Sequence, residues 1–403
     1  MPVLSFFSRR TFNATISSLE FSQQWLNPSD VFSVLLILGG DVVARALAQL
    51  AGSAITPVAF SFGWVAYSVA AVVQAVGENT LMPASDCACK VINGSNGFAR
   101  DNSSWVIGRI VRDFETWMDD GKSNGPIRQC LESIRNEEWL ADQNIKPPSR
   151  VGLCVSIYKA KQARPGHPGY DRAYVSGFVT VITQLVLAAI PCGLYGNWGI
   201  LLVTAAGTVL SFATGALPQW AKEKWICRRG VTKTVVLTRG NGSQHAIVIV
   251  SDGKGLDFED LAAASSMSFS SRQTRLAILI LAALWIILLI TAAGIRQHAW
   301  FLFAVGGIGT LENIYVAGIS RSPKDFGVPL EFVKVIGHHK VMQALYDVES
   351  LYPCLGRSML PVFFPGDLRQ DELDRWAEYD KLATERGQRY EGKGLAGEVR
   401  RQR

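Results

Sequence analysis

The sequence predicts a membrane all-α bundle of about six transmembrane helices in three hairpins, with a small cytosolic α+β domain built from two loop insertions. Three observations support this prediction. Of the 403 residues, 48% are hydrophobic and only 18% are charged, whereas about 25% are charged in soluble domains. The apolar residues are concentrated in six runs of membrane length. Very short links join these runs in pairs, and long polar segments separate the pairs.

The length of the runs is what indicates a membrane. A bilayer core of about 30 Å needs roughly 20 apolar residues in a helix. The runs are 31–50, 56–76, 174–195, 199–217, 276–295 and 299–319. The alternative is that they are core helices of a soluble protein, but such helices are rarely this long and apolar on every face. The first run is the weakest candidate because it contains charged residues.

Positive charge predicts the orientation. Only Arg45 lies inside a run and only Arg296 lies in a short link, while every other Lys and Arg lies in a tail or a large loop. The positive-inside rule therefore places both tails and both large loops in the cytosol. The membrane would be the plasma membrane or an endomembrane. A mitochondrial presequence at the N-terminus is the less favoured alternative to a solvated tail.

This orientation divides the chain into seven parts. They are a cytosolic N-tail (1–29), a transmembrane hairpin (30–76), an α+β insertion (77–173), a second hairpin (174–217), an insertion with a β-hairpin and a helix (218–275), a third hairpin (276–319), and cytosolic C-terminal helices with a tail (320–403).

The polar segments have their own patterns. Short apolar stretches bounded by turn signals predict strands at 90–93, 151–158, 232–238 and 244–250. Apolar residues at helical spacing predict helices at 103–118 and 127–140, and further helices are expected near 256–264, 330–351 and 370–388. These elements favour one small domain, although each loop could also pack independently on the membrane face.

Three charged residues inside the runs are candidates for a functional role. Asp41 and Arg45 are four positions apart and share a helix face. Because charge is costly in a bilayer, an ion pair that orients the helix is favoured over an ion or proton pathway. A re-entrant or interfacial first run is a third alternative. For Glu312, snorkelling or a hydrogen bond within the bundle is favoured over a transport path.

No catalytic, cofactor-binding or metal-binding residues are predicted. The stretch Asp252-Gly-Lys-Gly lacks the spacing of a phosphate-binding loop. The seven cysteines contain no CxxC pair, so reduced thiols are expected. His338 and His339 are adjacent and are expected to point to different faces of a helix. The spread of basic residues favours anionic lipid headgroups over nucleic acid as a partner.

Several long motifs resemble a family of fungal (ascomycete-type) multi-pass integral membrane proteins of uncharacterised function. They are LNPSDVFSVLLILGGDVVARALAQLAG, TPVAFSFGWVAYSV, CKVIN, GFARDNSSWVIGRIVRDFE, GGIGTLENIYVAG, ISRSPKDFG and PVFFPGDLR, and they span most of residues 26–376. The resemblance implies membrane insertion and supplies no functional residues. Glu312 stands where the family pattern has Gln, which weakens a charge-dependent role there.

These patterns leave two functional hypotheses. The favoured one is a non-enzymatic membrane scaffold whose cytosolic domain binds protein partners or lipid headgroups. The alternative is a transporter or channel that uses Asp41, Arg45 and Glu312.

Overall fold

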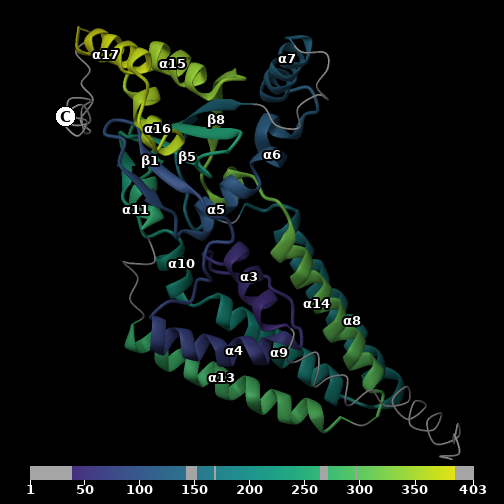
Figure 1. The fold of residues 1–403 in the computed structure, drawn as a ribbon. Helices are drawn as coiled ribbons and strands as arrows, with labels where there is room; N and C mark the ends of the chain where they lie inside the picture. Colours follow the sequence, from purple (N-terminus) through teal and green to yellow (C-terminus); the bar gives the residue numbers. More distant parts are fainter. Residues whose placement is uncertain (1–38, 142–151, 168, 264–270, 296, 386–403) are drawn as a thin grey trace, which may run out of the picture.

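The computed structural model describes residues 39–141, 152–167, 169–263, 271–295 and 297–385 (Figure 1). It has two parts: a group of long apolar helices and a mixed sheet with helices on both faces. The predicted N-tail and the beginning of the first apolar run lie outside the described residues.

Three helices are long and apolar enough to cross a membrane: α8 (Arg172–Tyr195), α13 (Arg272–Ala293) and α14 (Ala299–Gly318). A fourth candidate is the pair α9 (Gly199–Gly215) and α10 (Pro218–Lys224), which is bent by 42°. These helices correspond to the second and third predicted hairpins. The prediction of about six spanning helices is not supported, because the described residues contain three or at most four candidates.

The first predicted hairpin is the part that differs. Its described helices are α3 (Gly40–Leu50) and α4 (Gly63–Val73), each of 11 residues, with a π-helical turn, η1 (Gln74–Glu78), after α4. Eleven residues rise only about 16 Å, roughly half of a bilayer core. The interpretation of 56–76 as one spanning helix is wrong, because residues 56–62 have no helical turn before Gly63.

Residues 56–62 form neither helix nor strand, and this stretch, which we call the extended segment, is buried among the long helices. Gln184 of α8 donates one hydrogen bond to the carbonyl of Phe60, at 2.7 Å, and another to a carbonyl of α14. Asn313 of α14 donates to the carbonyl of Ala59 at 3.1 Å. Non-helical backbone at membrane depth is tolerated only where protein or water satisfies its polar groups. Two side-chain amides supply part of that satisfaction here.

Glycines make room for the same segment. A Cβ atom on Gly309 of α14 would lie 1.8 Å from the carbonyl oxygen of Phe60, and one on Gly177 of α8 would lie 2.0 Å from that of Pro57. Both values are below any real contact distance. The glycines of the GGIG stretch, residues 306–309 of α14, thus permit close contact with non-helical backbone as well as with neighbouring helices.

The long helices converge at the end away from the sheet (Figure 1). The ring of Tyr195, at the end of α8, stacks on His298, just before α14, with centroids 4.2 Å apart. Trp198 and Trp300 are exposed at the same end. Exposed aromatic residues are typical of a membrane–water interface. The sheet therefore lies at one end of the helical part, and this aromatic tip lies at the other.

The main sheet has six strands in the order β2-β1-β5-β6-β3-β8. Its strands are β1 (Lys90–Asn93), β2 (Ala99–Asp101), β3 (Leu153–Ala160), β5 (Thr234–Thr238), β6 (His245–Val250) and β8 (Leu330–His338). Only β3 and β6 are parallel to each other, while the other neighbours are antiparallel. A separate two-stranded sheet joins β4 (Arg229–Val231) to β7 (Gly255–Leu256). The four strands predicted from sequence are confirmed within a few residues.

Helices cover both faces of the main sheet, and alternate strand residues contribute to two cores, because successive side chains point to opposite faces. One face carries α5 (Trp105–Arg112), α6 (Phe114–Trp117), α7 (Pro126–Ala141) and α11 (Phe258–Ala262), and the other carries α15 (Val341–Leu351), α16 (Leu355–Phe363) and α17 (Gln370–Glu385). Short 3-10 turns, η2 (Met118–Gly121) and η3 (Pro323–Phe326), complete the list.

The predicted helix at 330–351 is wrong in its first half. Residues Leu330–His338 form β8, which pairs with β3, and only Val341–Leu351 form a helix. The unpaired edge of β3 offers backbone partners that outweigh local helical spacing. The sheet domain therefore uses the C-terminal segment as well as the two insertions.

Candidate functional site

Charged side chains are buried where the long helices meet the sheet domain. Arg321 lies just after α14, and its guanidinium contacts both carboxylate oxygens of Asp171 at 2.7 and 2.9 Å. Asp171 is also the N-cap of α8. A third nitrogen of Arg321 donates to the carbonyl of Gln49, at the end of α3, at 2.6 Å. One arginine therefore links three helices, and we call this cluster the charged junction.

Arg109 brings α5 into the charged junction. Its side chain is fully buried and lies 3.0 Å from Asp86, and it donates to the carbonyl of Ala317 at the end of α14. The guanidinium also stacks over the ring of Trp105. Burial lowers the pKa of Arg109 to about 10. Arg109 therefore keeps its charge at neutral pH and ties the sheet domain to α14, a candidate spanning helix.

Two adjacent residues of α10 bind the backbone at the two ends of residues 51–81, which contain the extended segment and α4. The carboxylate of Glu223 accepts hydrogen bonds from the backbone N–H groups of Leu81 and Met82, after η1, at distances of 2.7–3.0 Å. The amine of Lys224 donates to the carbonyls of Gln49 and Ala51, before the extended segment, at 3.0 and 2.8 Å. The segment thus enters and leaves on the side of the sheet domain.

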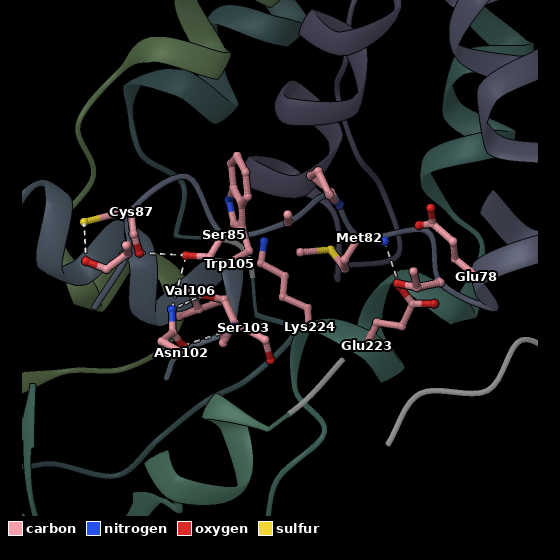
Figure 2. A pocket seen from close by; sticks show the side chains of 15 residues that line it. Glu78, Met82, Ser85, Cys87, Asn102, Ser103, Trp105, Val106, Glu223 and Lys224 are labelled. Atoms are coloured by element: carbon pink, nitrogen blue, oxygen red, sulfur yellow. Dashed lines mark hydrogen bonds between the residues drawn. The ribbon is translucent and has the colours of Figure 1, made fainter. Parts of the chain in front are cut away.

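A pocket of about 460 Å³ lies beside these residues, between α10 and the start of α5 (Figure 2). Glu223 and Lys224 line it together with Trp105 and Asn102. Glu223 already accepts hydrogen bonds from the backbone, and Lys224 already donates to two carbonyls. Both side chains are therefore engaged with backbone partners and do not stand free for proton transfer.

A second concave surface lies at the start of α8 and carries a different set of charges. This boundary groove, about 530 Å³, lies between residues 161–169 and 324–329, whose backbones are joined by hydrogen bonds. Its basic side chains are all exposed, and they are Lys161, Arg164, His167 and Lys324. Asp325 is the acidic residue in its lining, and burial raises the pKa of that carboxyl. The surface is therefore mainly cationic.

The boundary groove lies next to the ends of two candidate spanning helices. One wall precedes α8, and the other follows α14 after a few residues. Tyr170, between the groove and α8, is 64% exposed and its ring contacts Tyr174. Tyr is enriched at membrane interfaces, where its ring lies at headgroup level. The groove and this exposed tyrosine therefore lie together at the ends of two candidate spanning helices.

The structure shows where each residue predicted from sequence lies. Asp41 and Arg45 form the expected i,i+4 ion pair at 3.0 Å, but both side chains are well exposed on α3. Glu312 of α14 accepts a hydrogen bond from Ser176 of α8 at 2.7 Å. The ion pair and Glu312 thus have different partners on different helices.

The sequence analysis did not identify the charged junction. Lys224 and Arg321 count there only among the basic residues outside the apolar runs, and Asp171, Arg109 and Glu223 are not singled out. A signal was available in the sequence, because acidic residues as well as basic ones lie just outside the apolar runs. The pairing partners could not be read from sequence because they are far apart along the chain.

No group of three or more His, Cys, Asp or Glu side chains able to hold a metal ion occurs among the described residues. His338 and His339 lie at the end of β8 with their rings stacked. No family model, curated protein or solved structure matches this chain. The fungal resemblance stays a prediction from the sequence motifs.

Proposed function

We propose that this chain is a non-enzymatic multi-pass integral membrane protein whose sheet domain lies on the cytosolic membrane face and binds anionic lipid headgroups. The observation that carries the proposal is the boundary groove, in which Lys161, Arg164 and Lys324 surround a concave surface beside the ends of α8 and α14. Anionic lipids attract such side chains by about 1 kcal/mol for each Lys or Arg near the surface.

The charged junction supports the scaffold part of this proposal. It ties α5 of the sheet domain to α3, α8 and α14 through buried arginines. A domain held in this way keeps one orientation to the bilayer, so its outer face could present a constant surface to protein partners. Membership of the fungal family that the motifs resemble is part of the same proposal.

Neutralising the groove should weaken lipid binding. We expect the full-length triple variant Lys161→Gln, Arg164→Gln, Lys324→Gln to bind short-chain phosphatidylserine or phosphatidylinositol in detergent at least tenfold more weakly than the parent, because three charges of about 1 kcal/mol each are lost. Native mass spectrometry across a lipid titration measures this. Phosphatidylcholine binding should be unchanged.

The matched control removes three exposed lysines of the sheet domain, Lys334, Lys340 and Lys381, which lie in or beside β8 and α17 (Figure 1). It loses the same net charge. If the control variant lost as much affinity as the groove variant, the attraction would be a property of net charge and the groove proposal would be wrong.

One observation favours the transporter or channel alternative. Transporters often place irregular backbone at their binding sites, and residues 56–62 are extended among the long helices. However, glycine contacts bring this backbone against α8 and α14, which is typical of a packed element. Asp41 and Arg45 are also exposed rather than directed at that backbone.

The double variant Asp41→Asn, Arg45→Gln tests this alternative. If our proposal is correct, the free energy of unfolding of the variant should lie within about 1 kcal/mol of that of the parent, because exposed ion pairs contribute little. Cation or proton flux into proteoliposomes, followed with a pH-sensitive or potential-sensitive dye, should equal that of protein-free liposomes for both proteins. A flux that the parent supports and the variant abolishes would instead establish transport.

A further inference from the structure

Two cysteines from different elements meet on one face of the sheet. Cys154 lies in β3 and is fully buried, and Cys130 lies on α7 and is half-buried. Both belong to the core between the sheet and the helices α5, α6, α7 and α11. They come from opposite sides of the 142–151 segment, so the sequence does not place them together.

A glycine is what allows the two thiols to meet. Cys154 is paired with Gly337 of the antiparallel neighbour β8. Opposite residues of an antiparallel pair point to the same face, with Cα atoms about 4.5–5.5 Å apart. A Cβ atom on Gly337 would lie 2.9 Å from the sulfur of Cys130. The sulfur of Cys130 therefore occupies the side-chain space of Gly337, directly beside the side chain of Cys154.

The two thiols also interact. A hydrogen bond with Cys130 is the main cause, and burial the second, of a raised pKa of the Cys154 thiol. Cys154 is therefore protonated in the reduced protein. The more accessible Cys130 is the thiol that an oxidant in solution reaches first.

We propose that Cys130 and Cys154 are a redox-switchable pair that fastens α7 covalently to the sheet. With hydrogen peroxide as oxidant, the Cys130 thiol becomes a sulfenic acid and one water is released. The Cys154 sulfur then attacks the Cys130 sulfur, the S–O bond breaks and a second water leaves, so two thiols and one peroxide give one disulfide and two waters. A dithiol reductant reverses the step by thiol–disulfide exchange.

The disulfide changes how α7 can move. In the reduced protein α7 is held on β3 and β8 by packing, including Ile134 next to Gly337. A disulfide between Cys130 and Cys154 prevents the local opening motion in which α7 separates from the sheet. Amide hydrogen exchange in α7 therefore slows by at least tenfold on oxidation, whereas exchange in α15 and α16, on the other face, stays the same.

The test uses the full-length protein in detergent, treated with a low excess of peroxide and then alkylated. Peptide mass spectrometry is expected to show a Cys130–Cys154 linkage that dithiothreitol removes. Cys87 and Cys89, buried in the same core, serve as internal controls and should remain as free thiols. Hydrogen exchange measured before and after oxidation reports on α7.

Two variants keep the proposal falsifiable. Cys130→Ser should fold normally and lose both the linkage and the slowed exchange. Gly337→Ala should displace the Cys130 sulfur and reduce the linkage yield several-fold, whereas Gly366→Ala, where a Cβ meets nothing within 4 Å, should leave it unchanged. Oxidation of Cys130 to sulfinic acid without any linkage to Cys154, in protein that is still folded, would overturn the proposal.

Discussion

Replacing Arg321 with Met should lower the free energy of unfolding by about 3–5 kcal/mol. The substitution removes the two contacts to Asp171 and the hydrogen bond to the carbonyl of Gln49. It also leaves the Asp171 carboxylate largely buried without its partner, since that side chain is only 14% exposed. Removing one partner of a buried ion pair is strongly destabilising for this reason.

The midpoint of thermal unfolding, followed by tryptophan fluorescence in a fixed detergent, measures the effect. The control is Arg369→Met, which breaks an ion pair with Glu372 in which the arginine is 75% exposed. We expect the midpoint of the control to stay close to that of the parent, because exposed ion pairs contribute little. Equal shifts for Arg321→Met and Arg369→Met would show that the charged junction does not hold the two parts of the molecule together.

The substitution Gly309→Ala should cost about 3 kcal/mol, at the upper end of overpacking effects. A methyl group at this position would lie 1.8 Å from the carbonyl oxygen of Phe60. That oxygen cannot move freely, because it accepts the hydrogen bond from Gln184. Either α14 or the extended segment must therefore shift, and a buried hydrogen bond is lost or weakened.

The neighbouring glycine provides a control on the same helix. A Cβ on Gly307 meets nothing within 4 Å, and Ala is favoured over Gly in a helix interior by up to about 1 kcal/mol. Gly307→Ala should therefore be neutral or slightly stabilising in the same unfolding measurement. If the two alanine variants had the same midpoint of thermal unfolding, the close approach of the extended segment to α14 would be incorrect.

Apolar length predicted α8, α13 and α14 well, because each is a continuous run with apolar residues on all sides. The same criterion failed for residues 56–76. Composition does not distinguish an apolar helix from non-helical apolar backbone, some of whose carbonyls accept hydrogen bonds from Gln184 and Asn313. Those amides lie far along the chain, so no local pattern announces them. The strand β8 was missed for a related reason, because its partner β3 lies in a distant segment.

The candidate site was predictable only in part. The expectation of anionic headgroups as partners came from the basic residues outside the apolar runs, and Lys324 is one of these residues. The groove itself depends on hydrogen bonds between residues 161–164 and 327–329, which the sequence does not specify. The charges in the first apolar run that drew attention first, Asp41 and Arg45, pair locally and are exposed.

The hydrogen bonds of the extended segment have a consequence for biosynthesis. The carbonyl of Ala59 has a local partner in the indole N–H of Trp64, but Phe60 leaves the ribosome long before Gln184, which donates to its carbonyl. Irregular backbone cannot remain in lipid in that condition. If the long helices span a bilayer, as we propose, this part of the segment has to stay outside the hydrocarbon region until α8 supplies Gln184, although it is one of the first segments to be synthesised.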